Sequence, residues 1–171
     1  LLEEVLDVLV LGAGLTGVAC AYWLSKFGRD VCLLDPRGVS GGATGRNGGH
    51  LSPHISLSDP ELTQFELGSV NELKAFIETE GIDCELRQGG SLSLRSQSET
   101  EMPRPEDIPS PCSLWDQEKV AAAMHTDQFG WGIFNPEACQ LWPAKLVYCM
   151  AQRALDTGHT RIFENYRVAS V

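Results

Sequence analysis

Three glycines near the start of the chain have the spacing of a phosphate-binding turn. Gly12, Gly14 and Gly17 form a G-x-G-x-x-G pattern. In such a pattern the first glycine permits a tight turn, the second lets the backbone approach a diphosphate, and the third lets a helix lie close to a sheet. The diphosphate would bind free backbone N–H groups at the positive end of that helix. The glycines therefore indicate a site for the diphosphate of a dinucleotide.

An acidic residue follows at a spacing that suits the same site. Asp35 lies beyond Gly17 at close to the interval of about 20 residues at which an acid hydrogen-bonds the ribose hydroxyls of a dinucleotide. Its carboxylate would also repel a 2′-phosphate, so the sequence disfavours NADP.

A strand, a helix and a second strand are needed to position these residues, and the sequence predicts all three. An apolar run at Val8–Leu11 predicts a short strand that is buried on both faces. Apolar residues recur at helical spacing over 15–22, and Gly28 marks the end of that helix. A second apolar run, Val31–Leu34, ends at Asp35. A parallel sheet with glycine turns and no ligand is the alternative, and this context favours the dinucleotide site.

A second glycine-rich segment distinguishes a flavin from a nicotinamide cofactor. Residues 41–50 read GGATGRNGGH, with too many glycines for a packed helix start and too many hydrogen-bonding side chains for a linker. Together, GAGLTG, LLD and SGGATGRNGGHLSP resemble the amino-terminal part of FAD-dependent oxidoreductases of the D-amino-acid oxidase type, which include glycine, sarcosine and gamma-glutamylputrescine oxidases. An NAD-linked dehydrogenase is a further alternative, and the ATGRNGGH stretch argues against it.

The resemblance implies a set of FAD contacts. In that family the first motif holds the ADP half of FAD, and the second runs under the diphosphate, the ribityl chain and the isoalloxazine ring. At the matching positions of this sequence the implied cofactor-binding residues are Gly12, Gly14, Gly17, Asp35, Arg37, Thr44, Asn47, Gly48 and, through backbone groups beside the adenine, Val168.

The resemblance also implies an oxidoreductase that transfers a hydride from a carbon bearing an amine to flavin N5. The substrate would be a small amine or amino acid. Arg46 could stabilise reduced flavin or hold a substrate carboxylate, and its alternative role is to bind carbonyl groups of its own loop. His50 could contact the flavin, shuttle a proton or attach FAD covalently, and its alternative role is a hydrogen bond to backbone.

The implied fold class is α/β, a Rossmann-like FAD-binding βαβ domain with the start of an α+β substrate domain, truncated. We assign residues 1–58 and 143–171 to the FAD-binding domain and residues 59–142 to the substrate domain. The expected later elements are a core-packing helix over 60–81, a strand pair around Gly89-Gly90, a loop over 96–113, a helix over 116–125 capped by Asp116 or Ser113, a strand, turn and strand over 130–142, a helix over 143–158, and strands over 161–163 and 166–171.

The resembling enzymes are longer than 171 residues. We therefore expect a fragment of a longer protein, or one of two chains that together make the enzyme, and no well-behaved monomer by itself. The alternative function is a non-catalytic remnant or nucleotide-binding module that lacks the substrate site.

Composition excludes other function classes. The contents of 43% hydrophobic and 21% charged residues are typical of a globular protein, and a net charge of −10 argues against nucleic acid and anionic membranes. No apolar run approaches the ~20 residues of a membrane span. The six cysteines are scattered without metal-ligand spacing, which favours free thiols, no metal site and a cytoplasmic location, with a peroxisome as the alternative.

Overall fold

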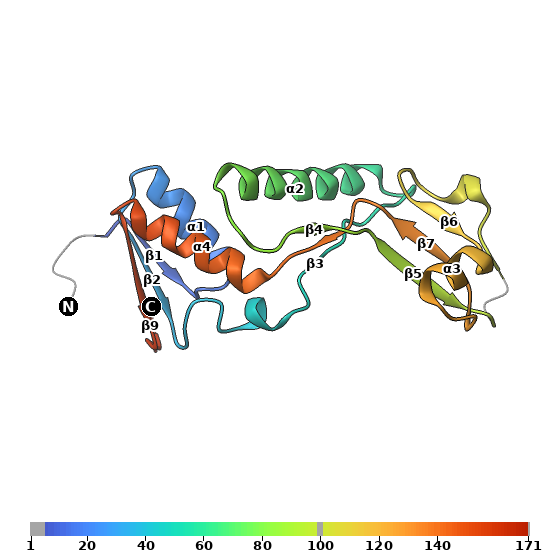
Figure 1. Ribbon diagram of the computed structural model, residues 1–171. Coiled ribbons are helices and arrows are strands. Elements are labelled where there is room, and N and C mark those ends of the chain that lie inside the picture. The colour runs from blue at the N-terminus through green and yellow to red at the C-terminus, as the bar shows by residue number, and fades with distance from the viewer. Residues whose placement is uncertain (1–5, 99–100, 171) are drawn as a thin grey trace. The chain divides into compact units, whose positions relative to one another are not determined.

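The computed structural model describes residues 6–98 and 101–170, and its contacts divide the chain into two units (Figure 1). Unit 1 comprises the described residues of Leu1–Gly49, Gly81–Cys84 and Trp142–Val171. Unit 2 comprises those of His50–Glu80 and Glu85–Leu141. The assignment of the chain to an FAD-binding and a substrate domain stays a prediction.

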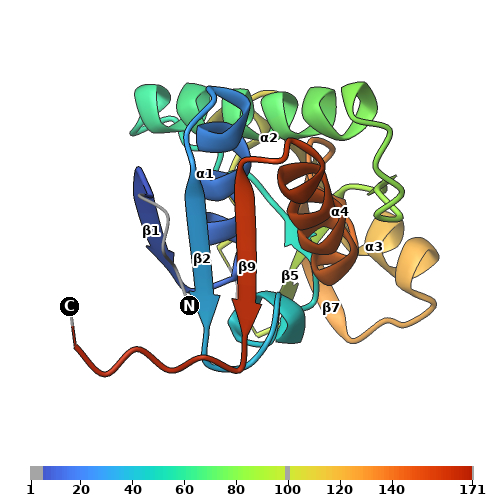
Figure 2. The same cartoon turned by 90° about the vertical axis from the view of Figure 1, so that its left-hand side faces the viewer.

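Unit 1 is a parallel sheet with helices on one face. The strands are β1 (Val8–Leu11), β2 (Val31–Asp35) and β9 (Thr160–Glu164), in the order β1-β2-β9. The helices α1 (Leu15–Lys26) and α4 (Pro143–Asp156) pack against each other and lie on the same face of the sheet (Figures 1 and 2). This arrangement confirms the predicted α/β class and the strand, helix, strand order at the start of the chain.

The first strand is less buried than its sequence predicts. Leu9 and Leu11 are 48% and 49% exposed, so the prediction of a strand buried on both faces is wrong for β1. The reason is that β1 is an edge strand with one neighbour, whereas β2 lies between two strands and buries its first three residues completely. The central strand of this sheet is therefore β2.

The chain turns away from the sheet after β9. The sequence predicts a further strand over 166–171, and the described residues 166–170 form none, while residue 171 lies outside the described residues. Asn165 has a positive φ of 62°, and its N–H donates to the carbonyl oxygen of Arg37. The N–H of Tyr166 donates to the carbonyl oxygen of Asp35. These two bonds hold the chain against the segment that follows β2.

Unit 2 contains two small antiparallel sheets. One has the order β3-β8-β4, formed by His50–Leu51, Cys139–Gln140 and Arg87–Gln88. The other has the order β5-β7-β6, formed by Ser91–Ser96, Phe129–Asn135 and Ser113–Trp115. The predicted strand pair around Gly89-Gly90 is wrong, because β4 pairs with β8 while β5 pairs with β7. The segment over 130–142 likewise supplies strands to both sheets.

Three helical segments complete unit 2. They are α2 (Pro60–Thr79), α3 (Gln117–Met124) and the short 3-10 helix η2 (Pro105–Asp107), which lies within the predicted loop. The α3 helix is capped by Asp116, whose Oδ1 accepts a hydrogen bond of 2.9 Å from the N–H of Lys119. Of the two caps considered from the sequence, Ser113 instead belongs to β6.

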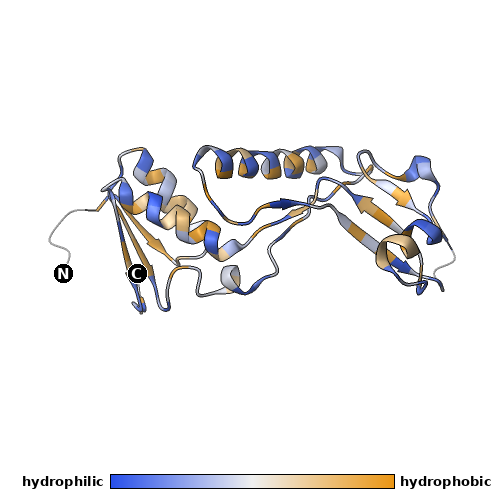
Figure 3. Ribbon diagram, in the orientation of Figure 1, coloured by the Kyte–Doolittle hydropathy of each residue, from blue (hydrophilic) through white to orange (hydrophobic). Residues whose placement is uncertain are grey.

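The long helix α2 begins as predicted, and its predicted core-packing face is only partly buried. Asp59 caps it, since its Oδ1 accepts from the N–H of Leu62, and Pro60 occupies the first turn. Ile77 is the one buried residue of the helix, and Phe65 is 72% exposed. Figure 3 shows hydrophobic and hydrophilic residues alternating along α2. The pattern is amphipathic and partly covered, because Leu73 and Phe76 are half-buried whereas Leu62 and Phe65 are exposed.

The cysteines occur as free thiols in both units. All six are unpaired with one another, and burial raises the pKa of the Cys32, Cys112 and Cys139 thiols, which favours their protonated form. In the part of the chain that the structure describes, no group of three or more His, Cys, Asp and Glu side chains could hold a metal ion. None of the described helices is both long and apolar enough to span a membrane.

Candidate cofactor site

The glycine turn between β1 and α1 is held by backbone contacts. The N–H of Gly12 donates to the carbonyl oxygen of Leu34 at 2.8 Å, and Gly12 has a positive φ of 104°. A Cβ atom on Gly17 would overlap the carbonyl oxygen of Gly12. The first turn of α1 therefore lies directly against the end of β1, which is the close approach that the third glycine of the motif is expected to allow.

The amino terminus of α1 is suited to an anion. The first four N–H groups of a helix have no partner within the helix. The N-cap residue Gly14 offers no side chain, and the first turn of α1 contains no acidic residue. Thr44 from the second glycine-rich segment supplies a hydroxyl here, because its Oγ1 accepts a hydrogen bond of 3.1 Å from the N–H of Leu15. A Cβ on Gly14 would lie 3.2 Å from that same oxygen.

Asp35 joins the glycine turn to the segment that follows β2. Its side chain is only 6% exposed. Its Oδ2 accepts from the N–H of Ala13 and its Oδ1 accepts from the N–H of Arg37, each at 2.8 Å. Two backbone donors thus stabilise the buried carboxylate. Since a carboxylate has about four acceptor positions, Asp35 keeps capacity for the ribose hydroxyls that the sequence assigns to it.

The second glycine-rich segment folds back on itself. It contains a short 3-10 helix, η1 (Ala43–Arg46). The Nδ2 of Asn47 donates to the carbonyl oxygens of Ala43 at 3.2 Å and Thr44 at 3.0 Å, and its Oδ1 accepts from the N–H of Gly49 at 2.8 Å. The amide of Asn47 therefore stabilises its own loop through three hydrogen bonds. Gly48 is exposed beside it.

The two arginines of the site differ in their surroundings. Arg37 reaches back over the second glycine-rich segment, since a Cβ on Gly42 would lie 2.9 Å from its Nη2. Arg46 is exposed at the end of η1. Among the described residues no hydrogen bond or ion pair of the Arg46 guanidinium is found, so the carbonyl-binding role considered from the sequence has no support.

The last two predicted residues are His50 and Val168. His50 belongs to unit 2, where it pairs with Gln140 between β3 and β8. Val168 follows β9 in unit 1, is 37% exposed and has no regular secondary structure. Unit 1 thus brings Gly12, Gly14, Gly17, Asp35 and Thr44 into one hydrogen-bonded arrangement.

Sequence reasoning missed two residues that hold this arrangement, Ala13 and Glu164. Ala13 uses both backbone groups, because its N–H bonds to Asp35 and its carbonyl oxygen accepts from the N–H of Ser40 at 2.8 Å. Glu164 accepts a hydrogen bond from the N–H of Val39. Their residue types give no indication of these roles, and only the position of Ala13 inside the motif could have drawn attention to it.

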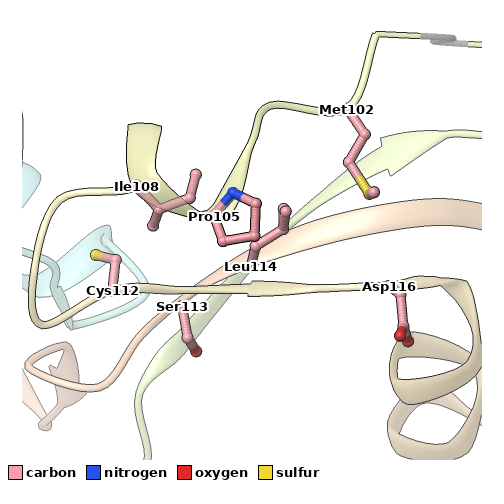
Figure 4. Close-up of a pocket in the computed structure, with 7 residues that line it drawn as sticks. All are labelled: Met102, Pro105, Ile108, Cys112, Ser113, Leu114 and Asp116. Atoms are coloured by element: carbon pink, nitrogen blue, oxygen red, sulfur yellow. The ribbon is translucent and has the colours of Figure 1, made fainter.

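Unit 2 contains a cavity of about 460 Å³ (Figure 4). It is lined by Met102, Pro105, Ile108, Cys112, Ser113, Leu114 and Asp116. Figure 4 shows the Leu114 side chain on the same side of its strand as Pro105 and Ile108, and Ser113 on the other side. Asp116 caps α3 and burial raises the pKa of the Cys112 thiol, so neither supplies an activated nucleophile. We assign no chemistry to this cavity.

Comparison with protein families agrees with the geometry of unit 1. The family described as FAD dependent oxidoreductase matches residues 7–171. The chain belongs to this family. The glycine turn, Asp35 and Thr44 should therefore be interpreted as features of an FAD dependent oxidoreductase.

Several known proteins are similar to this chain in sequence. The probable oxidoreductase OrdL of Haemophilus influenzae is 25% identical, over 96% of this chain and 42% of the relative. The gamma-glutamylputrescine oxidoreductase of Escherichia coli is 33% identical, over 49% of this chain and 22% of the relative. The chain therefore spans less than half the length of the relatives it matches.

Solved structures share the fold. Glycine oxidase from Geobacillus kaustophilus superposes with a TM-score of 0.79 at 21% identity, over 94% of this chain and 46% of that structure. L-alpha-glycerophosphate oxidase from Mycoplasma pneumoniae, solved with FAD bound, gives a TM-score of 0.75 at 17% identity, over 98% of this chain and 46% of that structure. These likenesses confirm the fold over the matched 94% and 98% of the chain.

Proposed function

We propose that the chain binds FAD and forms part of an oxidoreductase that acts on small amines or amino acids. One observation carries the proposal. The chain belongs to the FAD dependent oxidoreductase family, and its Asp35 and Thr44 are both hydrogen-bonded to the backbone of the Gly12–Gly17 turn. A helix terminus and a carboxylate therefore lie together. This is the pair of features that the ADP half of FAD needs.

The residues of unit 1 fit that cofactor. The diphosphate would bind at the Gly12–Gly17 turn and Thr44, where α1 presents its positive end and no acidic side chain. The ribose would bind at Asp35. When bound, FAD supplies the two-electron acceptor for oxidation of a carbon–nitrogen bond. The further proposed contacts of the same cofactor are Arg37, Asn47, Gly48 and Val168.

The proposed substrate class follows from the relatives and from one side chain. Glycine oxidase and gamma-glutamylputrescine oxidoreductase are named for an amino acid and an amine. The exposed guanidinium of Arg46 is available to a carboxylate, which arginine binds in a bidentate manner. Arg46 and His50 remain the candidate residues for substrate or flavin contact.

A non-catalytic FAD-binding module is the second candidate function. The chain spans 42% of the Haemophilus influenzae relative and 46% of the glycine oxidase structure, so the match includes only part of each protein. The parts of those proteins beyond this share have no counterpart in the 171 residues. A second polypeptide that supplies them would restore the enzymatic function.

We also propose a cytoplasmic location. Free cysteines are the usual state in a reducing compartment, and all six cysteines here are free. Fractionation of the source cells would test this, and recovery of the protein with peroxisomes would contradict it.

Titration of the purified chain with FAD tests the proposed function. We expect FAD to bind, ADP to compete, NADP to fail to compete because of Asp35, and the flavin to leave the chain on denaturation. Failure of the folded chain to bind FAD at saturating concentration would overturn the proposal. Flavin that stays on the denatured chain would instead identify a covalent ligand, with His50 as the first residue to substitute. Turnover of an amine by the chain alone would exclude the non-catalytic module.

A further inference from the structure

The last residue of β9 holds the loop that follows β2. The Oε1 of Glu164 accepts a hydrogen bond of 2.8 Å from the N–H of Val39. A Cβ on Gly38 would lie 3.0 Å from this oxygen, so the loop comes into close contact with the carboxylate. The two partners are separated by 125 residues in the chain. The contact therefore joins the end of the sheet to a loop of the cofactor site.

Two backbone bonds reinforce the same junction. The N–H of Asn165 donates to the carbonyl oxygen of Arg37 at 2.8 Å, and the N–H of Tyr166 donates to the carbonyl oxygen of Asp35 at 2.9 Å. Both bonds join backbone groups and do not use the Glu164 side chain. Glu164 adds a side-chain contact between the end of β9 and residues 38–39.

The opposite side of this loop is tied to the glycine turn. The N–H of Ser40 donates to the carbonyl oxygen of Ala13 at 2.8 Å, and the N–H of Ala13 donates to Asp35 at 2.8 Å. The loop over 35–40 thus lies between the glycine turn and the end of β9. An ordered loop binds a ligand without the entropy loss that a mobile loop would incur on binding.

We propose that Glu164 is a positioning residue for FAD, acting through its hydrogen bond to Val39. The inference rests on the proposed function. Glu164 need not touch the cofactor. It holds the loop that carries Arg37 and leads into the second glycine-rich segment, so that both glycine-rich segments are ordered before FAD binds. Its required property is an acceptor oxygen at the end of the side chain, and its charge is not required.

Two substitutions separate the acceptor from the charge. Glu164→Gln keeps a carbonyl oxygen that can accept from Val39, whereas Glu164→Leu has a similar size and no acceptor. We expect Glu164→Leu to weaken FAD binding on the order of fivefold, the size of one lost hydrogen bond, and Glu164→Gln to stay within about twofold of the wild type. The matched control is Glu72→Leu on the exposed surface of α2. FAD affinity is measured by quenching of flavin fluorescence.

Hydrogen exchange gives a readout that does not depend on FAD. In the chain without cofactor, Glu164→Leu should accelerate exchange of the Ser40 amide, which bonds to Ala13 and not to Glu164. Glu164→Gln should restore the wild-type rate. If Glu164→Leu fails to fold, Glu164→Ala replaces it, because it also removes the acceptor for the N–H of Val39 and adds no bulk at this exposed position.

The outcomes distinguish this inference from the proposed function. A wild-type chain that does not bind FAD overturns the proposed function, and the role toward FAD with it. Wild-type binding together with unchanged FAD affinity in Glu164→Leu, or in Glu164→Ala if the leucine variant does not fold, overturns the positioning role alone. Equal weakening by Gln and Leu would show that the charge acts, and would also overturn it.

Discussion

The two glycine-rich segments of unit 1 share close backbone contacts and differ in the side chains that hold them. In the first, Gly12–Gly17, backbone lies directly against backbone, and a Cβ on Gly17 would overlap the carbonyl oxygen of Gly12. The second, over 41–48, has one such approach, because a Cβ on Gly45 would overlap the carbonyl oxygen of Ser40. It also has side-chain bonds, since Thr44 accepts from the N–H of Leu15 and Asn47 binds its own loop. The site therefore has no room for an added atom at Gly17 or Gly45, and its second half depends in addition on particular hydrogen-bonding groups.

The largest expected effect comes from adding a methyl group to the first segment. Gly17→Ala should destabilise the chain by about 3 kcal/mol and abolish FAD binding, because the backbone must move to relieve the overlap. Urea denaturation and FAD titration measure the two effects. Gly68→Ala in α2 is the matched control, since a Cβ there meets no atom within 4 Å. It should be neutral or stabilising by up to about 1 kcal/mol. Equal behaviour of the two variants would contradict the steric account.

The second-largest effect is expected at Asp35, which links the first segment to the residues that follow β2. Asp35→Leu leaves the N–H groups of Ala13 and Arg37 without their acceptor and should cost about 2 kcal/mol in stability. Asp35→Asn keeps one acceptor oxygen and should cost less. The exposed Asp83 serves as control through Asp83→Leu. Loss of FAD affinity without loss of stability in Asp35→Leu would show that the carboxylate serves the ribose alone.

A smaller effect is expected where the two segments meet. Thr44→Val keeps the shape of the side chain but removes the acceptor for the N–H of Leu15, which should cost about 1 kcal/mol, as for the loss of a helix cap. Thr44→Ser keeps the hydroxyl and is the matched control. Both thermal stability and FAD affinity should follow the hydroxyl. A Val variant that binds FAD as tightly as Ser would contradict a role for Thr44 at the cofactor.

The sequence was sufficient for the first segment because its determinants are local. The spacing of Gly12, Gly14 and Gly17 between two apolar runs predicts β1, α1 and β2, and the structure has all three. The helix starts at Asp59 and Asp116 were also predicted, since a cap and its N–H partner lie three residues apart. Interactions within a few residues are what a single sequence reports best.

Features that depend on distant partners could not be predicted. The contact of Glu164 with Val39 spans 125 residues and has no sequence pattern. The apolar stripe of α2 shows that one face is suited to burial, but it does not show whether anything covers that face, and Phe65 is exposed. The strands on either side of Gly89-Gly90 likewise looked like a pair, yet each found a partner elsewhere along the chain.

The smallest effect separates two roles for Asn47. Its amide makes three hydrogen bonds within its own loop, and the side chain is exposed, so Asn47→Ala should cost about 1 kcal/mol or less. Asn47→Asp is the informative partner variant. It keeps the acceptor for Gly49 but places a carboxylate against the carbonyl oxygens of Ala43 and Thr44.

If Asn47 acts only by ordering its loop, the two variants should weaken FAD binding in proportion to their loss of stability. If the side chain also contacts the cofactor, FAD affinity should fall further than stability does in both variants. Urea denaturation and FAD titration on the same preparations give this ratio. If the loss of FAD affinity relative to the loss of stability is the same in Asn47→Ala as in Thr44→Val, both side chains serve to order the loop. The second segment would then act on FAD through its backbone shape, as the first one does.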